Sequence, residues 1–127
     1  CEIVPENFHH REHVRVAYIL LTRLNVKEVF TKLKNDLLSF LDFIGAGKSI
    51  YHETLTYSWL LTVNHFMYIS SPAESFNEFI NANKILLNKE SIYTDYSHTL
   101  IESDEARSNF LKPDLEPIPI HEKGSAL

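Results

Sequence analysis

The sequence predicts an all-α fold: an up-down-up bundle of three long helices, followed by short helices and an extended C-terminal tail. Three observations support this prediction. Apolar residues recur three and four positions apart in three successive stretches, which is the period of a helix that buries one face. Two of the three glycines stand close together at Gly45 and Gly47, where they favour a turn. Three of the five prolines, Pro113, Pro117 and Pro119, exclude regular helix near the end.

The first helix is predicted to begin at Phe8 or Arg11 and to end at Leu24. Its apolar stripe includes Val14 and Leu21, which lie on one helical face. Asn7 precedes it, and its side chain can accept a hydrogen bond from a backbone N–H that has no helical partner. We therefore expect Asn7 to be the N-cap.

The second helix is the clearest of the three and is predicted from Val26 to Ile44. Asn25 with Glu28 three positions later matches a capping box, in which each side chain bonds the other residue's backbone N–H. Lysines and Asp36 mark a polar face opposite the apolar stripe. Gly45 tolerates the left-handed conformation that often ends a helix, so we expect the helix to stop there.

The third helix is predicted from Ser49 to Ile69. It is apolar around most of its circumference, which favours a central position in the bundle. Short helices are predicted after Ser75 and after Ser103, since both can act as N-caps. The stretch from Lys84 to Ser97 is ambiguous and could hold a further short helix followed by an irregular, tyrosine-rich segment.

Length and composition indicate one helical domain over residues 1–120 with a flexible tail at 121–127. The formal charge of −5 argues against a general nucleic-acid partner, which would need a basic face. The lone Cys1 cannot form an internal disulfide, and no apolar run reaches the length of a membrane span or resembles a signal peptide. We therefore expect a cytoplasmic protein without a membrane partner, and a homo-oligomer is compatible with the sequence.

Histidines stand at the beginning of the first and third predicted helices. Short connections would make these two helices parallel, with their N-termini at the same end of the bundle. His10 lies in line with the apolar stripe of the first helix, His13 is three positions later, and His52 is in line with the stripe of the third. We therefore expect these imidazoles to converge at one end of the bundle. His65 lies on a different helical face from His52, so it is left out of this site.

This convergence predicts a transition-metal site. His10, His13 and His52 would supply nitrogens, and Glu53 would be a fourth ligand, or a general base acting on a bound water. Imidazole and carboxylate donors suit Zn, Fe, Mn, Ni or Cu without distinguishing among them. Arg15 could contact an anionic ligand, and Tyr51 and Thr56 could donate hydrogen bonds to a small molecule.

Three segments together resemble a family of small, uncharacterised bacterial helical proteins. The motifs are F-x-H-x-x-H-x-R-x-A at Phe8 to Ala17, Y-H-E-T-x-T at Tyr51 to Thr56, and P-D-L-x-P-x-P at Pro113 to Pro119. Tyr18 stands where that family tends to have Trp. The resemblance spans most of the chain and implies that His10 rather than His9 belongs to the site. It also implies roles for Arg15 and Thr56, but no reaction.

Two other interpretations remain open from the sequence. In the first, the protein is a non-enzymatic module that binds a ligand or partner, and the His/Glu cluster is a structural hydrogen-bond network. In the second, the histidines make an interface respond to pH, because imidazoles titrate near neutrality. Metal content would separate these interpretations from the metal-site prediction.

Overall fold

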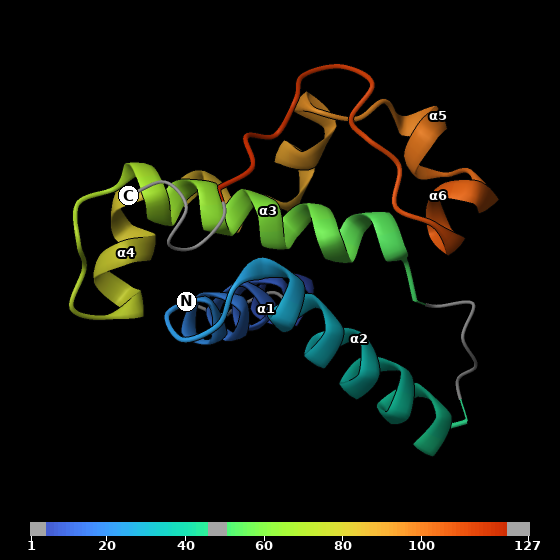
Figure 1. The fold of residues 1–127 in the computed structure, drawn as a ribbon, viewed down its shortest axis with the longest axis horizontal. Helices are drawn as coiled ribbons and strands as arrows, with labels where there is room; N and C mark the ends of the chain where they lie inside the picture. Colours follow the sequence, from blue (N-terminus) through green and yellow to red (C-terminus); the bar gives the residue numbers. More distant parts are fainter. Residues whose placement is uncertain (1–4, 46–50, 122–127) are drawn as a thin grey trace.

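The computed structural model describes residues 5–45 and 51–121, with side chains from His10 onward. Within these residues the secondary structure is helical and contains no strand. Three long helices, α1 (Pro5–Leu21), α2 (Val26–Phe43) and α3 (Glu53–Ile69), pack together as the sequence predicts. Figure 1 shows α3 running across the molecule, with α1 and α2 on one side of it. The short elements lie on its other side and around its C-terminal end.

The first helix begins earlier than predicted. Pro5 occupies its first position, where the missing N–H costs nothing and the fixed φ suits the helix. Asn7 therefore lies inside α1, and its predicted role as N-cap is wrong. Although α1 and α3 contain the same number of residues, α1 is seen nearly end-on in Figure 1, so its axis crosses that of α3.

The predicted limits of the second helix are confirmed to within one residue. Asn25 accepts from the Glu28 N–H at 2.9 Å, and Glu28 accepts from the Asn25 N–H at 3.0 Å, so the capping box is complete. Gly45 follows the helix with φ of 73°, the left-handed conformation expected of a glycine stop. Gly47 lies outside the described residues.

The third helix begins later than predicted. His52 has φ of −130° and ψ of 108°, which is extended backbone, so it precedes the helix and a start at Ser49 is wrong. The His52 side chain caps α3 by accepting a hydrogen bond from the Leu55 N–H. Histidine is not among the residues usually found as N-caps, so the sequence did not indicate this role.

The rest of the described chain consists of short helices and an extended end. α4 (Phe76–Ala82) and α6 (Asp104–Ser108) follow the predicted caps Ser75 and Ser103. Between them lie two 3₁₀ helices, η2 (Lys84–Leu87) and η3 (Lys89–Thr94), and the single-turn α5 (His98–Ile101). Residues 109–121, hereafter the C-terminal segment, have no regular helix and return along α3 (Figure 1).

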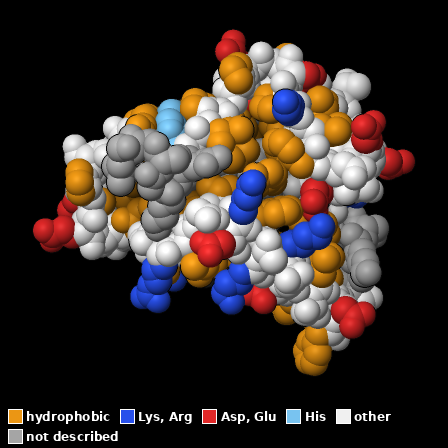
Figure 2. Space-filling model, viewed as in Figure 1, with side chains coloured by type: hydrophobic (Ala, Val, Ile, Leu, Met, Phe, Trp, Pro, Cys, Tyr) orange, Lys and Arg blue, Asp and Glu red, His pale blue; other side chains and the backbone are white. Residues whose placement is uncertain are grey.

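The core forms around α3, which packs against α1, α2 and α6. Val63 is fully buried and Leu60 nearly so, and both belong to one cluster with Val29 of α2 and Val14 of α1. Ile118 of the C-terminal segment joins this cluster. In Figure 2 apolar side chains gather over α3 and beside the C-terminal segment. Among the described residues, no helix is long and apolar enough to cross a membrane.

Candidate functional site

His52 uses both ring nitrogens to hold main-chain groups. Nδ1 accepts from the Leu55 N–H at 3.1 Å, so it carries no proton, and the proton on Nε2 is donated to the Ile101 carbonyl at 2.8 Å. The side chain is buried, with 8% of its surface exposed. His52 thus caps α3 and ties its first turn to α5, and neither nitrogen is open to a metal without breaking one of these bonds.

His10 is held in a similar way on a different part of the molecule. Its Nε2 lies 2.8 Å from the Leu86 carbonyl, and its ring packs edge-on against Trp59 with centroids 4.6 Å apart. A carbonyl can only accept, so Nε2 donates the hydrogen bond. Burial is the main cause that lowers the pKa of His10, and the bond to Leu86 opposes it.

The predicted ligand set is not brought together. Trp59, the partner of His10, lies seven positions after His52 on α3, or about 10 Å further along the helix axis at its usual rise. The crossing of α1 over α3 therefore separates the two imidazoles that a parallel arrangement would have joined. His13 is exposed on α1. In residues 5–45 and 51–121, no group of three or more His, Cys, Asp or Glu side chains is placed to hold a metal ion.

Two of the predicted ligand contacts serve the helices that carry them. Arg15 is exposed on α1, and its guanidinium lies 3.7 Å from the Glu12 carboxylate one turn earlier. Thr56 donates its hydroxyl hydrogen to the His52 carbonyl at 2.8 Å, and this carbonyl also accepts the Thr56 N–H at 3.1 Å, so the hydroxyl adds a second bond at the start of α3. Neither contact by itself indicates a ligand.

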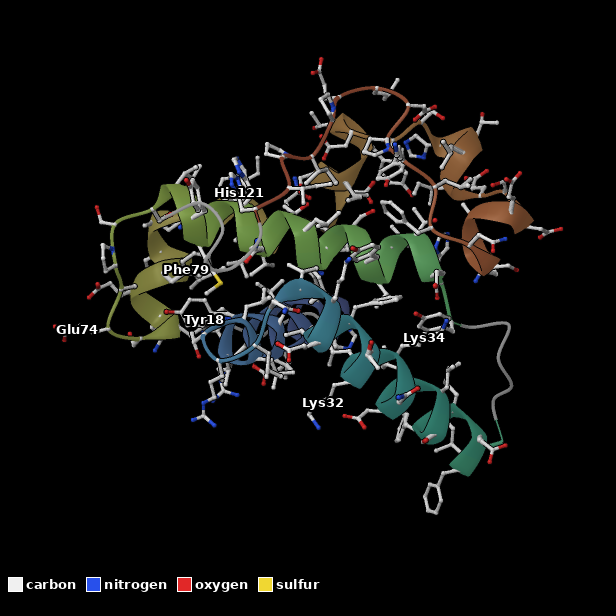
Figure 3. All side chains as sticks on the ribbon, in the orientation of Figure 1. Tyr18, Lys32, Lys34, Glu74, Phe79 and His121 are labelled. Atoms are coloured by element: carbon white, nitrogen blue, oxygen red, sulfur yellow. The ribbon has the colours of Figure 1, made fainter. Side chains whose placement is uncertain are left out.

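Tyr51 and Glu53, in contrast, do lie together. Lys34, which the sequence pattern did not indicate, joins them. The Tyr51 hydroxyl donates to Glu53 Oε1 at 3.0 Å, and Lys34 Nζ of α2 lies 3.0 Å from the same oxygen. Figure 3 shows Lys34 reaching toward the beginning of α3. The Glu53 side chain is 14% exposed, so this ion pair is partly shielded from water. We call Lys34, Tyr51 and Glu53 the Lys/Tyr/Glu cluster.

The cluster favours binding over proton transfer at Tyr51. Burial is the largest cause that raises the pKa of the phenol far above its ordinary value of 10.0, and the neighbouring Glu53 raises it further. Tyr51 therefore stays protonated and acts as a hydrogen-bond donor. Glu53 Oε1 already accepts from two donors, which stabilises the carboxylate in place.

A pocket of about 490 Å³ opens beside the Lys/Tyr/Glu cluster, between α2, the start of α3 and α6. It contains two cationic and two acidic side chains together with hydroxyl and apolar groups. Its lining residues are Lys34, Leu38, Tyr51, Glu53, Asp104, Arg107 and Ser108. Lys34 Nζ also lies 5.9 Å from the centroids of the Phe30 and Tyr51 rings, so two aromatic rings lie near its ammonium group.

A second polar arrangement involves residues that the sequence analysis set aside. His65 and His121 are hydrogen-bonded ring to ring at 2.9 Å, although 56 residues separate them in the chain. His121 is the first residue of the predicted flexible tail, and residues 122–127 lie outside the described residues. No short-range pattern signals such a pairing, because the C-terminal segment must first return along α3.

No protein-family model, no curated protein and no solved structure matches this chain. What the protein does is therefore inferred from the two polar arrangements described above and from the core that positions them.

Proposed function

We propose that this protein is a non-enzymatic binding module in which His10 and His52 are structural. The most direct support is that both ring nitrogens of His52 are hydrogen-bonded to main-chain groups, those of Leu55 and Ile101. Removing a partner from such a buried group costs about 1–3 kcal/mol, so a metal would have to compensate for the loss of both bonds. A metal site at His10, His13, His52 and Glu53 stays a prediction that metal analysis would decide.

The pocket beside the Lys/Tyr/Glu cluster is the binding site in this proposal. Lys34 and Arg107 can contact a carboxylate or a similar anionic group, while Glu53 and Asp104 can contact an ammonium group. Tyr51 supplies a protonated phenol as a donor. A small polar molecule that carries both charges, such as an amino acid, is the ligand class that this lining suits best.

The test is a thermal-shift and calorimetric screen of the twenty amino acids and simple dicarboxylates. We expect at least one compound to stabilise the protein, and Lys34→Met to weaken its binding at least tenfold, the loss of about 1.4 kcal/mol expected for a charge-assisted contact. Lys32→Met is the matched control, because Lys32 lies on the same helix and pairs with Asp36 at 3.6 Å, away from the pocket lining (Figure 3).

Three outcomes would contradict the proposal. The first is that no compound in the screen binds. The second is that Lys34→Met and Lys32→Met affect binding equally, which would place the ligand elsewhere. The third is that a bound compound is chemically converted, which would make the protein an enzyme and return Glu53 to the role of general base.

A further inference from the structure

The end of the C-terminal segment is held against α3 by one imidazole pair and its immediate surroundings. His65 Nδ1 and His121 Nε2 are 2.9 Å apart, and Asn64 Nδ2 donates to the His121 carbonyl at 2.7 Å. Tyr68 stacks on the His121 ring with centroids 3.9 Å apart. Figure 3 places His121 beside the C-terminal half of α3.

The two imidazole rings meet head-on rather than face to face. Their planes differ by only 8°, and their centroids are 5.1 Å apart. A separation of that size, with nitrogens 2.9 Å apart, is what two coplanar rings give when the bonded nitrogens point at each other. The space between the two nitrogens holds one hydrogen atom, so the contact is attractive only while at least one of these nitrogens carries no proton.

We propose that His65 and His121 form an acid-operated clasp, in which protonation of both imidazoles releases the end of the C-terminal segment from α3. When both rings are neutral, one nitrogen donates and the other accepts. When one ring is protonated, the imidazolium donates to the neutral ring and the bond is strengthened. When both are protonated, two N–H groups and two positive charges face each other, and no hydrogen bond is possible.

The surroundings of the pair favour this behaviour. Burial, followed by the charge of His121, lowers the pKa of His65 below its ordinary value of 6.5. Tyr68 is the other titratable group in contact with His121, and among the described residues no carboxylate is paired with either ring to stabilise a second proton. The clasp therefore stays closed at neutral pH and opens in mild acid.

Proton linkage gives the direction in which pH changes the stability of the closed state. Because the pKa of His65 is lowered in the closed state, the second proton binds more readily to the open state, so the closed state loses stability as the pH falls through this second step. In the pH range where only the open state takes up the second proton, the ratio of open to closed molecules should rise about tenfold for each unit by which the pH falls.

The test is an NMR titration of the full chain from about pH 8 to pH 4.5, a range that covers both histidine steps. We expect His65 and His121 to titrate in two coupled steps. The amide signals of Ile120 and His121 should move to unstructured positions with the second step, while those of α2, which contains no histidine, stay unchanged. Independent titration of the two rings near 6.5, or a segment that stays in place after both have titrated, would overturn the proposal.

Two variants make the result specific. His121→Phe keeps an aromatic ring for stacking on Tyr68 but removes the shared proton, so the position of residues 120–121 should no longer depend on pH. His98→Asn is the control, because His98 stacks on Tyr93 with centroids 3.6 Å apart, in another part of the molecule. A pH response that persists in His121→Phe, or disappears in His98→Asn, would show that the pair is not the sensor.

Discussion

Single side chains in this protein, buried or partly buried, join distant stretches of main chain. His52 bonds the Ile101 carbonyl, 49 residues away, and His10 bonds the Leu86 carbonyl, 76 residues away. Thr54 is fully buried, donates to the Asn109 carbonyl and accepts from the Leu111 N–H. Residue types that suggested chemistry in the sequence thus satisfy backbone groups that lack helical partners.

Replacing His52 should test its structural role. His52→Ala leaves the Leu55 N–H and the Ile101 carbonyl without this partner, so we expect a loss of about 2–4 kcal/mol in the free energy of unfolding. His52→Asn restores a capping acceptor and should recover about 1 kcal/mol of that loss. Urea unfolding with parallel elemental analysis measures both quantities. A stable His52→Ala protein that has lost one equivalent of metal would restore the metal-site prediction instead.

Tyr96 and Ser58 should be energetically coupled. Both are fully buried, the Tyr96 hydroxyl donates to the Leu111 carbonyl at 2.7 Å, and it lies 2.8 Å from Ser58 Oγ. Tyr96→Phe should cost about 1–3 kcal/mol because it leaves Ser58 without this bond. Adding Ser58→Ala should then cost less than it does in the wild-type protein, with a coupling of about 0.5–2 kcal/mol in a double-mutant cycle. Strict additivity would contradict the contact.

At the scale of elements, local sequence was a reliable guide wherever a signal acts within a few residues. The capping box at Asn25 and Glu28, the glycine stop at Gly45 and the cap at Ser103 are all present. The start of α3 could not be predicted in this way, because its cap is a histidine whose orientation depends on α5. Similarly, η2, η3 and α5 are too short to show a helical period.

The glycine stop after α2 gives a conformational prediction. A Cβ at Gly45 would meet nothing within 4 Å, so the cost of Gly45→Ala comes from its φ of 73° alone. We expect Gly45→Ala to lower the free energy of unfolding by about 1 kcal/mol. Gly45→Asn should cost less, since asparagine tolerates this conformation better. Thermal unfolding of the two variants checks the order, and equal losses would mean that the turn relaxes.

The start of α5 should depend on pH through Asp114. The Ser97 hydroxyl and N–H both donate to this carboxylate, at 2.6 and 2.8 Å, and they lower its pKa below the ordinary value of 3.8. A carboxyl with a lowered pKa stabilises the fold above that value, and the contribution disappears as the pH falls through the lowered pKa. The difference in stability between wild type and Asp114→Ala should therefore be present at pH 7 and shrink below 3.8. A constant difference would exclude this cause.

At the scale of the whole molecule, the all-α fold was predictable, but the arrangement that creates its polar sites was not. Helical periodicity identifies which residues are buried, yet it does not give the angle at which α1 crosses α3, and that angle separates His10 from His52. The Lys/Tyr/Glu cluster likewise requires Lys34 of α2 to meet the first turn of α3. Of the three residues in this cluster, only Tyr51 and Glu53 could be selected from the sequence, because they are close together in the chain.

The return of the C-terminal segment along α3 also has a consequence for synthesis of the protein. Thr54 bonds the Leu111 N–H, and Asn64 bonds the His121 carbonyl, so each waits for a partner made 57 residues later. At about 5–20 residues per second, translation leaves that face of α3 uncovered for roughly 3–11 seconds. During this interval a nascent chain exposes apolar surface that the finished protein buries. A chaperone would therefore find the largest apolar binding surface in this interval.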